Sequence, residues 1–271
     1  MPPIRLVTLN LLNDRSLWEQ RRQLVVDQLA ALQPDIIALQ EVTPTPDNTA
    51  RWLADQLGRY YVHYSPFSGK KRDKEGVAIL SRHKILRAEW LELSTQSRVA
   101  SLIEIDTPTR QVIVATTHLH WWPGEARQRD HQVQQLLDWL SPFSADRAVV
   151  VCGDFNGTPD TRAIRLMREK FTSAYAVVHG REPEYTCPTP LPLANNVKTV
   201  RDVWRVIRRK VIGLITNPQN KPWRGTLDYI FVDQHIRVSD CRVVLNQPAP
   251  DDARLYPSDH FGLMADFEVV K

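Results

Sequence analysis

Short apolar runs rich in β-branched residues recur along this chain, and each of them stops at an acid, an amide or a histidine. Such runs predict buried β-strands, with polar groups where the apolar character ends. The polar groups at the ends of these runs are Asn10, Glu41, His118, Asp154 with Asn156, Asp228, and Asp259 with His260. These groups can converge where the strands end. The pattern favours a β-rich fold with one metal-assisted site.

The length and composition of the chain predict one large domain. With 271 residues and 42% hydrophobic content, the chain can bury a substantial core. No stretch is long and apolar enough to cross a bilayer, so we expect no transmembrane segment. The three cysteines are odd in number and far apart, which argues against a disulfide framework. We therefore expect a cytoplasmic protein. We also expect a monomer.

The formal net charge of +4 favours a phosphate-bearing partner if the basic residues share one face. Basic clusters occur at residues 70–72 and 205–210. The alternative interpretation is a solvated loop for the first cluster and a solvated helix face for the second. Lys71 and Arg72 are our candidates for contact with substrate.

The order of the expected elements predicts two mixed sheets covered by helices. The first helix is indicated by a capping box at Ser16 and Glu19 and ends before Pro34. Further helices are expected at 46–57, 125–140 and 160–171. Four runs, GVAILS, ILRAEWLEL, RVASLIEI and QVIVATTHLHW, follow one another closely and predict an antiparallel meander. Three more strands are expected after Thr226.

Residues 175–223 form the part of the sequence with the weakest pattern. They contain several prolines and one expected helix around 200–212. We interpret the segment as a substrate-facing insertion, because no internal repeat or linker marks a second domain.

The acid and amide at the ends of the first two expected strands suit a hard metal ion. Hydrolysis of a phosphodiester needs a cation, donors aimed at the nonbridging oxygens and an acceptor for a proton of water. Glu41 follows the run IIALQ, and with Asn10 it offers oxygen ligands of the kind that Mg²⁺ or Mn²⁺ prefers. A capping or surface carboxylate is the alternative for Glu41.

Asp154 and Asn156 lie two residues apart after the run VVVCG, where an extended backbone points both side chains to one face. Asp154 can accept a proton from water while Asn156 donates a hydrogen bond that orients it. Gly153 allows close approach. The alternative is an Asx turn, which is compatible with catalysis.

Asp228 interrupts an apolar strand, and a buried carboxylate needs a partner. We expect Asp228 to fix the ring of His260, whose other nitrogen faces the phosphate or the water. Asp259 would then face the metal. A structural histidine is the alternative for His260.

His118 and His120 lie two residues apart and are followed by Trp121 and Trp122. A zinc site lacks a third ligand at suitable spacing, so we interpret His118 as a donor to a phosphate oxygen. The tryptophans either pack at the rim of a sheet or stack on a base or ribose of the substrate.

The ordered motifs TLN, LQEV, GVAILSR, TTHLHW, GDFN, TLDYIFV and SDH resemble those of the endonuclease/exonuclease/phosphatase superfamily, and the segment THLHWWPGE resembles its deadenylase-like members. The resemblance covers almost the whole chain. It implies a four-layered α/β sandwich (α+β) with two central mixed, mostly antiparallel β-sheets flanked by helices. It also implies dependence on Mg²⁺ or Mn²⁺. Its implied metal residues are Asn10, Glu41 and Asp259, and its implied catalytic residues are His118, Asp154, Asn156, Asp228 and His260.

The leading hypothesis is a metal-dependent phosphodiesterase, a nuclease that hydrolyses DNA or RNA by in-line attack of an activated water. The basic charge and the aromatic residues favour nucleic acid over other substrates. The alternative is a phosphomonoesterase, or a lipid or small-molecule phosphodiesterase, that uses the same site. A catalytically silent nucleic-acid-binding module is disfavoured, because binding alone does not require Asp154, Asn156 and His260 together.

Overall fold

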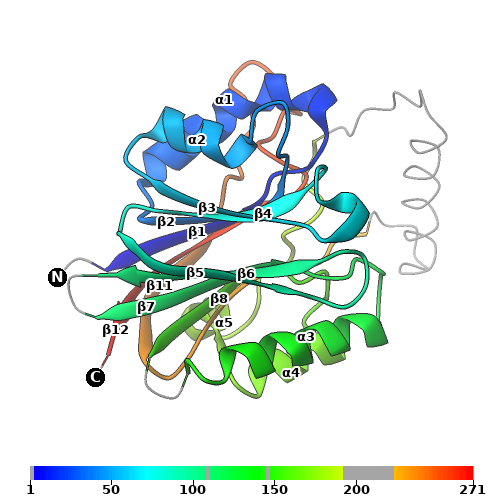
Figure 1. Cartoon of the computed structure of the whole chain (residues 1–271). Helices are drawn as coiled ribbons and strands as arrows, with labels where there is room; N and C mark the ends of the chain where they lie inside the picture. Colours follow the sequence, from blue (N-terminus) through cyan, green and yellow to red (C-terminus); the bar gives the residue numbers. More distant parts are fainter. Residues whose placement is uncertain (1–2, 108–109, 145–146, 192–222, 271) are drawn as a thin grey trace.

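The computed structural model describes residues 3–107, 110–144, 147–191 and 223–270. Two six-stranded mixed β-sheets lie at the centre of the molecule, and helices cover their outer faces (Figure 1). Helices α1 (Arg15–Leu32) and α2 (Thr49–Leu57) lie on one side. Helices α3 (Arg127–Leu140) and α4 (Arg162–Arg168) lie on the opposite side. The layers are therefore helix, sheet, sheet and helix.

The first sheet has the strand order β11-β12-β1-β2-β4-β3. Its strands are β1 (Ile4–Asn10), β2 (Ile36–Val42), β3 (Tyr61–Pro66), β4 (Gly76–Ser81), β11 (Ile236–Val244) and β12 (Gly262–Val269). Strands β1 and β2 are parallel, because α1 connects them as a crossover helix. The other neighbouring pairs are antiparallel.

The second sheet has the strand order β5-β6-β7-β8-β10-β9. Its strands are β5 (Ile85–Glu92), β6 (Val99–Asp106), β7 (Gln111–His118), β8 (Ala148–Asp154), β9 (Thr172–Ser173) and β10 (Asp228–Val232). Here β7 and β8 are the parallel pair, and α3 connects them. A short helix, α5 (Ala174–His179), follows β9. Each sheet thus contains one parallel pair, whose carboxyl ends lie at the same sheet edge.

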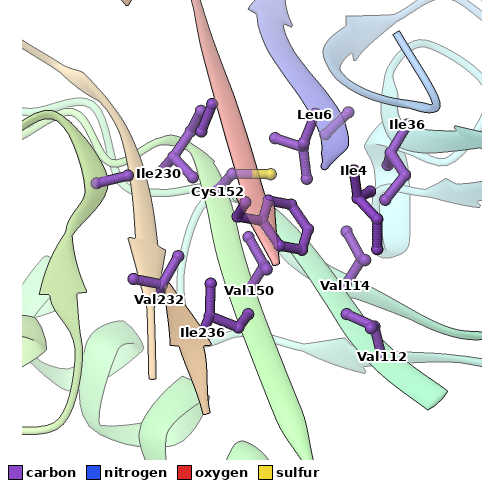
Figure 2. Packing of buried hydrophobic residues seen from close by; sticks show 14 of the residues in the cluster. Ile4, Leu6, Ile36, Val112, Val114, Val150, Cys152, Ile230, Val232 and Ile236 are labelled. Atoms are coloured by element: carbon purple, nitrogen blue, oxygen red, sulfur yellow. The ribbon is translucent and has the colours of Figure 1, made fainter. Parts of the chain in front are cut away.

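Three buried clusters hold the four layers together. Side chains at alternate positions of strands from both sheets form the middle cluster, as Figure 2 shows for Leu6, Val114, Val150 and Ile230. A second cluster joins the first sheet to α1 and α2, and a third joins the second sheet to α3 and α4. Cys152 lies in the middle cluster, in agreement with its expected role as a small core residue.

The core between the sheets becomes polar toward one end. The amide nitrogen of Gln40 on β2 donates to the Thr8 hydroxyl of β1 at 3.1 Å and to the Thr116 hydroxyl of β7 at 2.9 Å. All three side chains are fully buried. Because buried polar groups must be paired, this contact joins the two sheets and forms a transition between the apolar core and the polar strand ends beyond it.

The structure confirms the predicted fold class and changes the prediction at several elements. GVAILS, as β4, belongs to the first sheet, so the predicted meander contains only β5, β6 and β7. Both faces of β4 are buried, and its register matches β2 and β3 instead of β5. Helix α1 begins at Arg15, so Ser16 lies inside its first turn and is not its N-cap. Asn48 caps α2, which begins three residues later than predicted.

The expected helix around 200–212 and most of the segment 175–223 lie outside the described residues. The described part of the chain contains no helix that is long and apolar enough to cross a membrane.

Gly153 provides a test of how closely β7 and β8 approach each other. A Cβ atom at this position would lie 2.2 Å from the Thr117 carbonyl oxygen, and the backbone φ is +128°. We expect Gly153→Ala to lower the free energy of unfolding by more than about 2 kcal/mol, because neither the strand carbonyl nor the φ angle can adapt cheaply. Urea denaturation measures this loss.

Gly180→Ala is the matched control for the Gly153 variant. Gly180 has a left-handed backbone, with φ of +71°, and nothing lies within 4 Å of its added Cβ. We expect it to cost about 1 kcal/mol, the strain of the left-handed backbone alone. If both variants lost the same free energy of unfolding, the close approach to Thr117 would make no contribution to the cost.

Candidate active site

The polar strand ends of the two sheets meet at the polar end of the middle core. Asn10 ends β1, and Glu41 lies near the end of β2, in the first sheet. In the second sheet, His118, Asp154 and Asp228 are direct neighbours across β7, β8 and β10. The strands bring together groups that are far apart in the sequence, because the carboxyl ends of the parallel strands and the amino end of the antiparallel strand β10 lie at one edge.

Asp154 lies at the centre of this group and is 1% exposed. Its Oδ2 accepts a hydrogen bond from Asn10 Nδ2 at 3.0 Å, across the two sheets. Two imidazole nitrogens point at the same oxygen, His118 Nε2 at 3.5 Å and His260 Nε2 at 4.0 Å. Burial, together with the nearby charge of Asp228, raises the pKa of Asp154 to about 7. The carboxyl group is thus poised to exchange a proton near neutral pH.

His260 is held by a carboxylate, as the sequence predicted. Its Nδ1 lies 2.9 Å from Asp228 Oδ2, which also accepts a hydrogen bond from the Thr186 hydroxyl at 2.6 Å. Burial alone would lower the pKa of His260, but the neighbouring Cys187 sulfur and the charge and hydrogen bond of Asp228 raise it well above its usual range. The ring is fixed with Nε2 directed toward Asp154.

A second carboxylate–histidine contact, which the sequence analysis missed, involves Glu75 and His118. Glu75 Oε1 lies 3.6 Å from His118 Nδ1 and 3.5 Å from Arg98 Nη1. Burial and the charge of Glu41 raise the pKa of Glu75 to about 7. Burial and the positive charge of Arg98 lower the pKa of His118. His118 is therefore neutral at physiological pH, with one nitrogen facing Glu75 and the other facing Asp154.

Glu75 lies immediately before β4, whereas the pattern of apolar runs points to the polar residues that follow them. Strand β4 runs antiparallel to β2, so the residue before β4 lies at the same sheet edge as the residues that end β2. Arg98 precedes β6, which is antiparallel to β7, for the same reason.

Asn156 and Asp259 lie beside the central groups. The backbone N–H of Asn156 donates to Asp154 Oδ1 at 2.9 Å, so the Asx turn weighed in the sequence analysis is present. One side-chain amide hydrogen of Asn156 is donated to the Leu119 carbonyl at 3.1 Å. Asp259 is 9% exposed and accepts from the Ser258 hydroxyl at 3.4 Å.

The four predicted substrate contacts lie at the edge of the site. Trp121 and Trp122 have ring centroids 5.5 Å apart, and Trp122 is 57% exposed. Lys71 Nζ lies 5.9 Å from the ring centre of Phe67, which in turn packs 6.1 Å from the His118 ring. Arg72 is exposed.

The neighbours of these tryptophans have structural roles. His120 Nδ1 contacts the Thr95 hydroxyl at 3.1 Å, so His120 and His118 do not share a site. Arg129 is fully buried and donates to the carbonyls of His120 at 3.2 Å, Trp122 at 2.7 Å and Gly124. Arg129 therefore holds the tryptophan loop in place.

The donor atoms at the site fit a divalent cation. Two groups have ligand atoms within 4.8 Å of one another: Glu41 with Glu75 and His118, and Asp154 with Asp228 and His260. Glu41 Oε1 also lies 3.4 Å from Asn10 Nδ2, and Asp228 Oδ1 and His118 Nδ1 are buried atoms with no hydrogen-bond partner in the described part of the chain. Hard oxygens, imidazole nitrogens and buried atoms in need of a partner are what such an ion requires. Neither of the two groups found among the described residues includes Asp259.

The raised pKa of Asp154 predicts a pH-dependent effect on stability. Between about pH 4 and pH 7, the folded protein holds a proton on Asp154 that the unfolded chain does not. This contribution to stability is present at low pH and is lost as the pH rises through about 7. Asp154→Asn cannot ionise, so in chelator it should gain stability relative to the wild type over that range, as measured by urea denaturation at several pH values.

Asp55→Asn, at an exposed position of α2, is the control for this measurement. Its stability supplies the baseline for a surface Asp→Asn change at each pH. A difference between Asp154→Asn and the wild type that does not vary with pH would show that Asp154 ionises normally in the folded protein.

Comparison with known proteins agrees with this geometry. A model of the Endonuclease/Exonuclease/phosphatase family matches residues 7–260. The chain is 26% identical to Nocturnin of Drosophila melanogaster over 93% of its own length and 42% of the relative's. It is 28% identical to Nocturnin of Rattus norvegicus over 92% of its own length and 58% of the relative's. The chain thus spans about half the length of these curated relatives.

Solved structures show the same fold. The human Nocturnin catalytic domain with bound sulfate anion is 26% identical, with a TM-score of 0.74 over 99% of this chain and 94% of that one. Danio rerio TDP2 complexed with single-strand DNA product is 18% identical, with a TM-score of 0.74 over 98% of this chain and 99% of that one. Because the family model covers nearly the whole chain, the protein belongs to the Endonuclease/Exonuclease/phosphatase family.

Proposed function

We propose that this protein is a metal-dependent phosphodiesterase, a nuclease that hydrolyses DNA or RNA by in-line attack of an activated water. The observation that carries the proposal is the convergence of His118 Nε2 and His260 Nε2 on one oxygen of the buried Asp154. A carboxylate flanked by two fixed imidazoles supplies an acceptor for a proton of water beside donors for phosphate oxygens.

In this mechanism Asp154 accepts a proton from the attacking water, and Asn156 orients that water. The raised pKa of Asp154 makes it a stronger base than an ordinary carboxylate. His118 and His260 donate to the nonbridging oxygens of the phosphate as negative charge develops on them. Asp228 fixes the ring of His260, and Glu75 has the same positioning role for His118.

Asn10 and Glu41 would hold a Mg²⁺ or Mn²⁺ ion, with Asp259 contributing directly or through water. Members of this family depend on divalent metals, and the oxygen donors here suit a hard ion. When bound, the ion offsets the negative charge of the phosphate.

A nucleic-acid substrate is supported by charge and by aromatic side chains near the site. Lys71 and Arg72 lie on the loop that leads to Glu75, and Trp121 and Trp122 lie on the loop that follows His118. Cations of this kind bind the phosphate backbone, and exposed indoles stack on bases. The catalytic domain of human Nocturnin binds a sulfate, a tetrahedral anion of the same shape as phosphate. The three cysteines are free thiols, which fits the proposed cytoplasmic location.

The proposal predicts hydrolysis of nucleic acid that stops when divalent metal is removed. Purified protein should cleave single-stranded or double-stranded DNA or RNA with Mg²⁺ or Mn²⁺, and chelator should abolish cleavage. Gel analysis of labelled oligonucleotides, alongside phosphate release from small phosphoesters and lipids, measures this. Cleavage of only the small or lipid substrates would replace the nuclease with the alternative phosphoesterase, and binding without turnover would support a silent binding module.

Substitutions at the central groups should separate catalysis from folding. Asp154→Asn and His260→Gln should each lower kcat by about 10²- to 10⁴-fold, because each removes a group that acts on the water or the phosphate. Glu75→Gln should cost about tenfold in kcat with little change in KM, since it loosens the His118 ring without removing it. Asp55→Asn is the control and should match the wild type. Near-normal turnover in Asp154→Asn would overturn the assignment.

A further inference from the structure

A cavity of about 240 Å³ lies between α1 and α2, next to the proposed metal residue Glu41. Trp18 of α1 and Trp52 of α2 form its aromatic walls. Neither tryptophan has a part in the proposed mechanism. We call this cavity the Trp18–Trp52 pocket.

The Trp18 wall of the Trp18–Trp52 pocket is held in place by a buried arginine. The two rings meet edge to face, with centroids 5.7 Å apart and planes at 76°. Arg21 packs against the Trp18 ring at 5.5 Å and is itself fully buried. Its guanidinium donates to the carbonyls of Leu11, Leu12 and Pro257 at 2.7, 2.6 and 2.7 Å. Since Arg21 cannot move without breaking these bonds, the indole it supports presents a fixed surface.

The pocket adjoins the catalytic centre at Glu41. Glu41 lines it, and Glu41 Oε1 lies 3.4 Å from Asn10 Nδ2. The same amide nitrogen donates to Asp154 Oδ2 at 3.0 Å. A part of the substrate that occupies the pocket would therefore lie close, along the same molecule, to a phosphate bound over Asn10 and Asp154.

The rim of the pocket offers both donors and acceptors. Arg15 and Arg22 contribute guanidinium groups, and Asp14, Glu19 and Asp47 contribute carboxylates. Arg22 also packs over the Trp52 ring at 5.0 Å and pairs with Glu19 at 2.8 Å. Aromatic walls below a rim of mixed charge suit a ligand that has a planar ring with polar edges. An acyl chain would require a longer apolar groove without such charges.

We propose that the Trp18–Trp52 pocket binds the base of a nucleotide that adjoins the scissile phosphate. This inference rests on the proposed function and specifies a part of the substrate that the mechanism above leaves open. The base stacks against indole, and the polar rim contacts its edge. The volume suits a single ring system, since it is below the 300–1,000 Å³ or so that drug-sized ligands occupy.

A binding titration tests the pocket without any need for turnover. In the Asp154→Asn background with Mg²⁺, 2-aminopurine ribonucleoside 5′-monophosphate should lose fluorescence as its base stacks. Trp52→Leu should weaken this binding about tenfold, within the range of one stacked base, and Trp52→Phe should retain most of it. Trp90→Leu is the control, because Trp90 is 53% exposed on β5. No quenching at millimolar nucleotide, or equal affinity in Trp52→Leu and Trp90→Leu, would overturn the proposal.

Thermal unfolding of each variant separates loss of the pocket from loss of the fold. Trp52 is half-buried, so Trp52→Leu can lower stability. If Trp52→Leu is less stable, Trp52→Phe supplies the deciding comparison, because the proposal requires the phenylalanine variant to bind the nucleotide nearly as well as the wild type.

A cleavage series distinguishes failure of the pocket from failure of the proposed function. Oligonucleotides that carry one abasic nucleotide, moved along the strand, should be cut about tenfold more slowly when the missing base adjoins the scissile phosphate. This penalty should vanish in Trp52→Leu. An equal penalty in wild type and variant would overturn the pocket while leaving the nuclease intact. If the wild type cuts no oligonucleotide, the nuclease proposal fails and the titration alone decides what the pocket binds.

Discussion

The hydrogen bond from Asn10 Nδ2 to Asp154 Oδ2 joins the two sheets at their polar end, and the rest of the site depends on it. A carboxyl group that is 1% exposed is costly to bury without partners. Asn10 supplies a donor from the first sheet, and the backbone of Asn156 supplies another from the second. His118 and His260 then occupy the space around the remaining acceptor positions. The hydrogen-bond donors that compensate the buried Asp154 carboxylate are thus the same groups that hydrolysis at this site requires.

The same constraint explains how the core is graded from apolar to polar. Inward side chains of β1 change from Leu6 to Thr8 to Asn10, and β8 ends its inward row with Cys152 and Asp154. Gln40 bridges the sheets at the intermediate level. The apolar layers supply the burial that stabilises the sandwich, and the paired amide and hydroxyl groups separate them from the ionisable groups. Buried carboxylates at the opposite strand ends, such as Asp266 and Asp233, are instead paired with the Arg5 side chain and with backbone N–H groups.

Sequence reasoning was most successful where a residue follows a strand in the chain. Asn10, Glu41, His118 and Asp154 end parallel strands, and their common edge follows from that pattern. Glu75 and Arg98 precede strands and, unlike Asp228 and His260, lie in none of the motifs that the sequence offered, so only the antiparallel pairing of β4 with β2 and β6 with β7 brings them to this edge. The same missing information placed GVAILS in the wrong sheet. The Trp18–Trp52 contact was equally inaccessible, because no periodic pattern in either helix indicates how α1 and α2 cross.

Backbone conformation is a further reason why the catalytic groups at the strand ends are held rigidly while the loops around them are free to differ in sequence. Glu41 and Asn156 both have left-handed backbones, with φ of +57° and +52°. Each left-handed backbone conformation costs of order 1–3 kcal/mol of stability. It persists because the surrounding strands leave the backbone no other conformation. The central groups therefore keep their positions whatever lies beyond the strand ends. Substrate choice falls to the loops and helices around them, such as the tryptophan loop and the Trp18–Trp52 pocket. A fold organised in this way can support endonucleases, exonucleases and phosphatases on one central geometry.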